Sequence, residues 1–345
     1  MRPNAAIFKA VAAFSGKRVL VAGDLMLDRY WVGEVDRISP EAPVPILRKS
    51  GAFGVPGGAA NTACNVAALG ARVTLFGVTG QDEAGAELRG MLSKRGIDCS
   101  RISIAAGRPT TLKLRIMAHD RQMLRIDEED TAPIDASLAV DIVRRVVRLI
   151  PRVDAVVISD YAKGFAIEPV VVAIILTAAR HGKPVVVDPK GSSFERYRGA
   201  TVLKPNRNEL ALLTGLPARQ HQETMHAARH LLQLAGPAAI VVTEGKDGMT
   251  LLRPDVPEEH FPSFAREVYD VTGAGDTALA TLAVALAAGA PLSDAVWLSN
   301  LAAGLAVGES GTVAVSREKL TKALASLRRS PSAAATSHAK DSHGR

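Results

Sequence analysis

The chain contains few aromatic residues and few cysteines. Phe, Trp and Tyr make up 4% of its 345 residues, so its core must be built mainly from Val, Leu, Ile and Ala. Cys64 and Cys99 are too few for a disulfide framework and favour a reducing cytoplasm. The longest apolar runs, at 170–179 and 278–290, are too short to span a bilayer, and the interrupted apolar start does not resemble a signal peptide. We therefore expect no membrane partner.

The central part of the chain carries no net positive charge, although the formal net charge of the whole sequence is +7. Four of these charges lie in residues 1–18 and three in residues 328–345, so the stretch between them is neutral. A nucleic-acid partner would require a basic face on the folded body, and we expect none. Residues 1–16 form an N-terminal extension with a short amphipathic helix in this interpretation. Residues 328–345, rich in Ser, Ala and His, are expected to be a disordered tail.

Between these ends, short β-branched runs alternate with longer helical patterns. This alternation predicts parallel βαβ units, hence an α/β fold with a mostly parallel sheet and helices on both faces. Strands are expected at 17–23, 72–80, 155–160, 184–190, 201–206, 239–245 and 249–254. Helices are expected at 58–69, 82–95, 136–149, 167–181, 207–214, 222–235, 274–288, 292–308 and 316–327.

Two segments interrupt this alternation. Residues 30–55 contain three prolines and little helical pattern, and residues 101–127 have the pattern of a β-hairpin. Together they are expected to form a small accessory sheet, a lid over the site; the alternative is a pair of ordinary surface loops.

Several of the expected strands end in a polar residue. In an open α/β sheet, ligands bind beyond the carboxyl ends of the strands, so these residues mark the expected site. They are Asp24, Asp160, Asp188, Asn206 and Glu244.

The stretch EVYDVTGAGDT at 267–277 places glycines at the start of an apolar helix, with a carboxylate among them. The amides of Gly273, Ala274 and Gly275 can converge on an anion there, where the helix dipole also favours negative charge. Asp276 can accept the proton of a hydroxyl group, and phosphoryl transfer needs both elements. The alternative is that Asp276 only caps the helix.

Two other nucleotide-binding signatures are missing. The chain has no GxxxxGK[ST] segment, so it is not a P-loop protein. The first expected strand is not followed by GxGxxG, which excludes an NAD-dependent oxidoreductase of the usual kind.

DVTGAGDT and, earlier in the chain, PGGAANTACNVAALGARV (56–73) resemble the two signatures of the ribokinase-like (PfkB) carbohydrate kinases. The resemblance runs from about residue 17 to 325, and a kinase domain at 17–327 is expected. It implies the ribokinase-like fold with a small β-sheet lid, ATP and Mg²⁺ as cofactors, Asp276 as catalytic base, and Gly273, Ala274 and Gly275 as the anion hole.

The resemblance also assigns binding roles to residues that match the family's motifs. Sugar contacts are implied for Asp24, Asp28, Gly57, Gly58 and Asn61. Nucleotide contacts are implied for Asn206, Thr243, Glu244, Gly245, Thr272 and Asn300. Asn206 and Glu209 would hold Mg²⁺ through water, and Asp270 with Thr272 matches a loop that binds a monovalent cation such as K⁺. Asp24 could instead be a turn or cap residue, and Glu209 an exposed acid at a helix start.

The segments GDLMLDRYWVGEVDRISPEAPVPI (23–46), SDYAKG (159–164) and DPKG (188–191) are similar to those of heptose 7-phosphate kinases. This similarity implies phosphorylation of D-glycero-D-manno-heptose 7-phosphate at O1, in ADP-heptose and lipopolysaccharide synthesis, by a homodimer paired through its lids. The stand-alone kinase form is expected, since few residues follow the kinase. Cations that could hold the distal phosphate, though each alone is typical of a surface charge, are Arg115, Lys163, Lys190 and Arg125.

Two alternatives stay open at this point. One is a kinase of the same fold for another sugar phosphate or a nucleoside. The other is a non-catalytic sugar sensor, which the presence of Asp276, the glycines, Asn206 and Glu209 disfavours.

Overall fold

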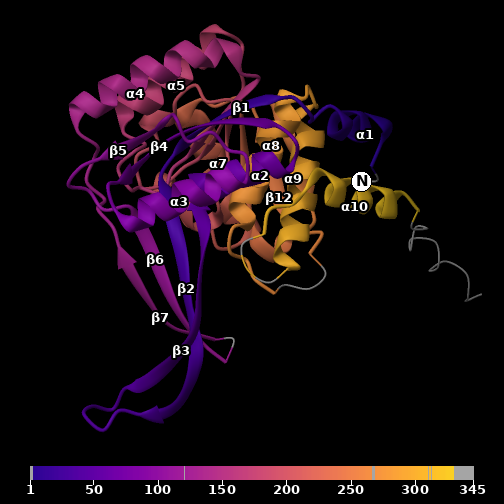
Figure 1. The fold of residues 1–345 in the computed structure, drawn as a ribbon. Helices are drawn as coiled ribbons and strands as arrows, with labels where there is room; N and C mark the ends of the chain where they lie inside the picture. The colour runs from indigo at the N-terminus through magenta and orange to yellow at the C-terminus, as the bar shows by residue number, and fades with distance from the viewer. Residues whose placement is uncertain (1–2, 120, 266–268, 310, 312, 330–345) are drawn as a thin grey trace, which may run out of the picture.

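The computed structural model describes residues 3–119, 121–265, 269–309, 311 and 313–329. Within these residues the main sheet has nine strands in the order β13-β12-β11-β10-β9-β8-β1-β4-β5 (Figure 1). Its strands are β1 (Arg18–Gly23), β4 (Arg72–Gly80), β5 (Ile102–Ala105), β8 (Ala155–Ser159), β9 (Val185–Asp188), β10 (Val202–Leu203), β11 (Ala239–Thr243), β12 (Met249–Arg253) and β13 (Val256–Phe261). All neighbours are parallel except β11–β12 and β12–β13.

Helices cover both faces of this sheet. They are α1 (Ala5–Ala12), α2 (Ala59–Ala68), α3 (Glu83–Lys94), α4 (Ala136–Leu149), α5 (Glu168–Arg180), α6 (Arg207–Thr214), α7 (His221–Ala235), α8 (Ala274–Ala287), α9 (Leu292–Val307) and α10 (Arg317–Arg329). Short 3₁₀ turns lie at Ile150–Arg152, Glu195–Tyr197 and Gly245–Asp247.

The alternation of side chains along each strand produces two core layers. Val19 and Val21 of β1 pack in the layer that contains α2, α8, α9 and α10. Leu20 and Ala22 pack in the layer that contains α4, α5, α6 and α7. Because both faces are buried, the central strands β1, β8, β9, β10 and β11 are mostly apolar, which is the pattern that predicted a parallel sheet.

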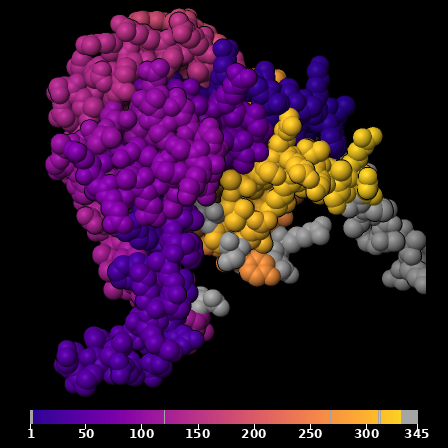
Figure 2. All heavy atoms as spheres, viewed as in Figure 1, coloured from indigo at the N-terminus to yellow at the C-terminus, as the bar shows by residue number. Residues whose placement is uncertain are grey.

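A second sheet of four strands projects from one side of the body, in the order β3-β2-β6-β7. Its strands are β2 (Leu25–Ile38), β3 (Pro45–Gly58), β6 (Thr111–Ala118) and β7 (Arg121–Glu128). Figure 1 shows them leaving the body together, and in Figure 2 the β2–β3 hairpin is the narrow arm at the bottom of the view. The expected lid is therefore present, and the predicted α/β fold is confirmed.

The structure differs from the sequence-based expectations in several boundaries. Residues 102–105, expected in the lid, form β5 and pair with β4 in the main sheet, because their apolar side chains complete its edge. The lid strands extend beyond 30–55, to Leu25 and Gly58. Strand β13 was not expected, since its sequence VPEEHF is largely polar.

A helix lies near each end of the described chain, α1 at the N-terminal end and α10 at the C-terminal end. Arg328 and Arg329, expected in the tail, belong to α10, while the rest of the expected tail, 330–345, lies outside the described residues. Helix α1 confirms the short N-terminal helix. Among the described residues, no helix combines the length and the apolar character needed to cross a bilayer. Cys64 and Cys99 are free thiols.

Candidate active site

Asp276 lies in the first turn of α8. It is 3% exposed, and it accepts hydrogen bonds from three side chains. Asn61 Nδ2 donates to Oδ2 at 2.8 Å, while Thr62 Oγ1 and the Tyr161 hydroxyl each donate to Oδ1 at 2.9 Å. Each carboxylate oxygen can accept about two hydrogen bonds. Oδ1 is therefore fully used, and Oδ2 keeps room for one more donor.

The electrostatic surroundings make Asp276 a usable base. Burial raises the pKa of Asp276, while the hydrogen bonds from Asn61, Tyr161 and Thr62 and the charge of Lys204 act against that rise. Burial and the neighbouring carboxylate also raise the pKa of Tyr161 well above its usual range, so its hydroxyl stays a donor.

The start of α8 forms a cradle for an anion. Gly273 caps the helix with a φ of 78°, a left-handed conformation that glycine adopts without strain. The first N–H groups of a helix have no acceptor within it, and they carry the positive end of the helix dipole. The N–H of Ala274 donates to the carbonyl oxygen of Val271 at 3.3 Å, so this expected member of the anion hole is already bonded. The ammonium group of Lys204 adds a full charge: it lies 3.9 Å from the position that a Cβ atom on Gly275 would take.

Asp24 follows β1 and organises the loop after β8. Its carboxylate is buried and accepts the backbone N–H groups of Tyr161 at 2.8 Å, Lys163 at 3.1 Å and Phe165 at 3.0 Å. The same loop carries the Tyr161 hydroxyl to Asp276. Asp24 therefore acts as the cap residue that the sequence left open as an alternative, at the edge of the expected sugar site.

Gly57 and Gly58 end β3 at positions that leave no room for a side chain. A Cβ on Gly57 would lie 2.3 Å from Oδ2 of Asp28, and a Cβ on Gly58 would lie 2.6 Å from the carbonyl oxygen of Asp24. Gly58 also has a φ of 57°. The pair thus brings the base of the lid against Asp24 and Asp28, and it starts α2, which carries Asn61.

The cations expected for a sugar phosphate come from the lid strands and from the loops after β8 and β9, and each has an acidic partner. Arg115 on β6 pairs with Asp28 on β2. Lys163 pairs with Glu129 at 2.7 Å. The expected cations Lys190 and Arg125 pair with Glu209 and Asp127. Arg115 and Lys163 lie near the base of the lid and are largely buried, whereas Arg125 is half exposed.

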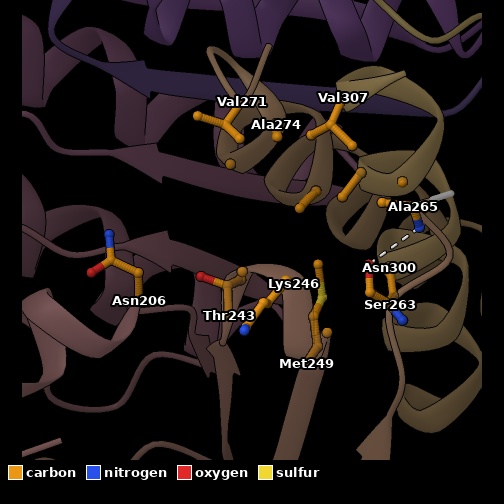
Figure 3. A pocket seen from close by; sticks show the side chains of 16 residues that line it. Asn206, Thr243, Lys246, Met249, Ser263, Ala265, Val271, Ala274, Asn300 and Val307 are labelled. Carbon is orange, nitrogen blue, oxygen red and sulfur yellow. Dashed lines mark hydrogen bonds between the residues drawn. The ribbon is translucent and has the colours of Figure 1, made fainter. Parts of the chain in front are cut away.

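A cavity of about 330 Å³ opens beside the start of α8 (Figure 3). Figure 3 shows Val271, Ala274 and Val307 on one side of it and Thr243, Lys246 and Met249 on the other. Of the residues expected to bind nucleotide, Asn206, Thr243, Gly245 and Asn300 line the cavity. Such a volume and mostly apolar wall suit a nucleoside.

Three expected nucleotide residues have other contacts. The Asn300 amide donates to the carbonyl groups of Phe261 at 3.1 Å and Pro262 at 2.8 Å, so it shapes the cavity wall. Glu244 is not among the residues that line the cavity; its carboxylate binds Arg207 at 2.7 Å and Thr250 at 2.5 Å. The Thr272 N–H donates to Oδ1 of Asp270 at 2.8 Å, which fixes the expected cation loop.

Asn206 and Glu209 form a reciprocal cap at the start of α6. Asn206 Oδ1 accepts the Glu209 N–H, and Glu209 Oε2 accepts the Asn206 N–H, both at 2.9 Å. Glu209 is buried, not exposed as the alternative supposed, and its Oε1 lies 2.9 Å from Lys190 Nζ.

Comparison with known proteins decides the family. The model of the pfkB family carbohydrate kinases matches residues 17–319. The chain belongs to this family. It is a carbohydrate kinase with a ribokinase-like fold.

Relatives of this PfkB kinase agree with that assignment. The bifunctional protein HldE of Rhodospirillum rubrum is 47% identical over 324 residues, which cover 94% of this chain and 65% of that protein. Arabidopsis thaliana ribokinase, solved with ribose and ATP, has a TM-score of 0.73 at 20% identity, over 90% of this chain and 99% of its own. Phosphofructokinase-2 of Escherichia coli in complex with potassium has a TM-score of 0.72 at 21% identity, over 91% and 100%. The two structures support the fold.

PfkB kinases imply Mg²⁺ together with ATP, and the residues of this chain fit that ion. Burial raises the pKa of Asp188 to about 7, Lys204 opposes this rise, and the charges of Glu209 and Asp276 add to it. Oxygen donors with excess negative charge suit a hard divalent cation. Asp188, Glu209 and Asn206 are therefore the residues that would hold Mg²⁺, directly or through water.

Three residues of this PfkB site were not singled out from the sequence: Lys204, Tyr161 and Thr62. Lys204 is 2% exposed, and its Nζ lies 3.1 Å from Asp188 Oδ2. A lysine among apolar residues at the end of a buried strand is rare without a function or a partner, and this signal could have identified it. Tyr161 had no such signal, because its contact with Asp276 joins segments 115 residues apart.

Proposed function

We propose that this chain transfers the γ-phosphoryl group of ATP to the anomeric O1 of D-glycero-D-manno-heptose 7-phosphate, giving the 1,7-bisphosphate for ADP-heptose and lipopolysaccharide synthesis in the cytoplasm. The observation that carries the proposal is the position of Asp276: a buried carboxylate with one open acceptor site on Oδ2, at the start of α8 and close to Lys204. The choice of heptose rests on the motifs quoted above and on the 47% identity to HldE.

The proton transfer follows from the hydrogen bonds of Asp276. The O1 hydroxyl of the sugar donates to Oδ2, the oxygen that only Asn61 occupies. As O1 bonds to the γ-phosphorus, the proton passes to Oδ2 and the bond from that phosphorus to the bridging oxygen breaks. ADP leaves with the electron pair. Thr62 and Tyr161 keep Oδ1 fixed, so the base needs little reorganisation.

The developing charge on the phosphoryl group needs fixed positive partners. The N–H groups at the start of α8 and the ammonium of Lys204 point to the same region. Mg²⁺, held by the residues named above, would supply further charge neutralisation on the phosphate oxygens. The nucleoside would lie in the cavity along α8 and α9, between Thr243 and Val307.

The sugar would lie between Asp276 and the base of the lid. Asp24, Gly57, Gly58 and Asn61 form its floor in this proposal, and Asp28 binds its hydroxyl groups. Arg115 and Lys163 already pair with carboxylates, and the distal phosphate would take over part of these pairs. Closure of the lid would exclude water and limit hydrolysis of ATP.

The proposal also includes a homodimer paired through the lids and a monovalent cation site. The edges of the lid sheet are β3 and β7, and exposed apolar side chains lie along them: Phe53, Met123, Leu124 and Ile126. Pairing of two lids in a homodimer would cover these residues. The loop fixed by Asp270 and Thr272 would bind a monovalent cation, as the potassium complex of phosphofructokinase-2 suggests for that protein.

The decisive experiment is turnover of heptose 7-phosphate with ATP and Mg²⁺, followed by phosphorus NMR of the product. A new anomeric phosphate signal coupled to H1 is expected. Fructose 6-phosphate, ribose and adenosine are tested in the same ADP-release assay. Faster turnover of one of these would replace heptose by that acceptor, and no ADP release with any acceptor would favour a non-catalytic sugar sensor.

A further inference from the structure

A cluster of metal-ligating side chains lies outside the kinase site. His221 is the first residue of α7, Glu244 follows β11, and His260 lies on β13. One ligand atom from each residue can be chosen so that all three lie within 4.8 Å of one another. Neither histidine has a place in the phosphoryl transfer described above, and Glu244 does not line the nucleotide cavity.

Two of the distances between ligand atoms in the cluster are close to those between the ligands of a bound ion, and all three atoms lie within 4.8 Å of one another. Nδ1 of His221 lies 3.5 Å from Oε2 of Glu244, and Nδ1 of His260 lies 3.8 Å from Oε1. Bonds of about 2.0–2.1 Å in a tetrahedral zinc site place neighbouring ligand atoms roughly 3.4 Å apart. Both imidazoles are partly exposed, 48% and 39%, which leaves room for side-chain rotation. Nδ1 of His260 also lies 2.9 Å from the Thr250 hydroxyl, and an ion would take the place of this contact.

The buried carboxylate is held in position from behind. Glu244 has no exposed side-chain surface, and the hydroxyl of Thr250 donates to its Oε1 at 2.5 Å. A carboxylate ligand that is fixed by a hydrogen bond needs less ordering when a metal binds. The two histidines lie on the solvent side, so an ion can reach the cluster.

The charges around the cluster leave an excess of one negative charge. Arg207 binds both Glu244, at 2.7 Å, and Asp247, at 2.9 Å. One guanidinium therefore faces two carboxylates. When an ion binds Glu244, Asp247 can retain Arg207, and the cation replaces the interaction that Glu244 gives up.

We propose that His221, Glu244 and His260 form a binding site for a divalent transition-metal ion of the Zn²⁺ class, with water at the open position. Two imidazoles and one carboxylate are ligands that Zn²⁺ accepts, whereas Mg²⁺ and Ca²⁺ prefer oxygen donors alone. The ion would join α7, β11 and β13. It would also restrain the turn at 245–248, of which Gly245 lines the nucleotide cavity. This site does not depend on which sugar the kinase phosphorylates.

The test is metal binding by the untagged full-length chain after removal of metals with a chelator. Titration calorimetry with ZnCl₂ should show one saturable site, and Co²⁺ should give the visible absorption of a four-coordinate ion. His221→Ala and His260→Ala should each weaken binding at least tenfold, which is roughly the smallest loss seen when even a supporting partner of a ligand is removed. Zn²⁺ should raise the Tm of the wild-type chain but not that of the His221→Ala/His260→Ala double variant.

Matched controls separate this site from other histidines. His226 is exposed on the same helix α7, and His226→Ala should bind Zn²⁺ as the wild type does. His338 and His343 lie outside the described residues, and replacing both by Ala should also leave binding unchanged. The proposal is overturned if the wild type shows no saturable site, if the double variant binds as tightly as the wild type, or if either control weakens binding as much as His221→Ala.

Discussion

The hydroxyl of Tyr161 donates a hydrogen bond of 2.9 Å to Oδ1 of Asp276. Tyr161 lies in the loop after β8, and Asp276 lies in the first turn of α8, so the contact joins the two halves of the chain. It stabilises the ionised carboxylate and leaves Oδ2 for the substrate.

Replacing Tyr161 by Phe should change the pH dependence of kcat/KM. The hydrogen bond from Tyr161 lowers the pKa of Asp276, so its loss raises that pKa. Because the base must be deprotonated, activity falls as the pH drops through this pKa. The acidic limb of Tyr161→Phe should therefore move to higher pH. Tyr197→Phe, which removes a buried hydroxyl bound to Asp160, is the control and should leave the limb in place.

Asp276→Asn should reduce kcat by about two to four orders of magnitude, the usual contribution of a general base. Binding of the sugar phosphate, measured by calorimetry, should change little. Asp294 occupies the equivalent third position of α9, and Asp294→Asn is the matched control for a carboxylate in a first helical turn. If Asp276→Asn kept full turnover, Asp276 would not be the base.

Lys204→Met should lower kcat by roughly 10²–10³-fold, as removal of one fixed partner of transition-state charge does. The loss of this charge also raises the pKa of Asp276 and of Asp188. The acidic limb should therefore move to higher pH in this variant too. Lys183→Met, before the start of β9, tests whether the loss of a lysine alone has this effect; equal losses in both variants would argue against a role at the phosphate.

Gly57→Ala should destabilise the fold and weaken sugar binding. The new Cβ would lie 2.3 Å from Oδ2 of Asp28, and such overpacking typically costs about 1–3 kcal/mol. Urea denaturation measures the free energy of unfolding, and the KM for the sugar should rise because Asp28 is displaced. Gly51 lies on the same strand β3 with nothing within 4 Å of its Cβ position, so Gly51→Ala should be nearly neutral in both measurements.

Leu124→Asp should dissociate the proposed homodimer. Leu124 is 57% exposed on β7, and burying a carboxylate in a lid-to-lid interface without a partner is costly. Sedimentation velocity should show a monomer for this variant and a dimer for the wild type. Leu176 is similarly exposed on α5, and Leu176→Asp should stay dimeric. A monomeric wild type, or dissociation by both variants, would place the interface elsewhere or remove it.

The sequence by itself determined the fold class and located the start of α8, where the proposed base lies. Buried strands that alternate with helices leave little choice but a parallel sheet, because both of its faces must be covered. The glycines before Asp276 identified the start of α8 for a similarly local reason, since helix ends expose N–H groups whatever the fold. Local chemistry of this kind is encoded within a few residues.

Only the tertiary structure decided which side chains meet. Tyr161, Thr62 and Asn61 converge on Asp276 from distant segments, and Lys204 comes to lie close to Gly275 because strand and helix ends share one edge of the sheet. Glu244 follows β11, and the structure surrounds its carboxylate with Arg207 and the two histidines, which come from other segments of the chain. Contacts between segments far apart in the chain depend on strand order and packing, which no short stretch of sequence specifies.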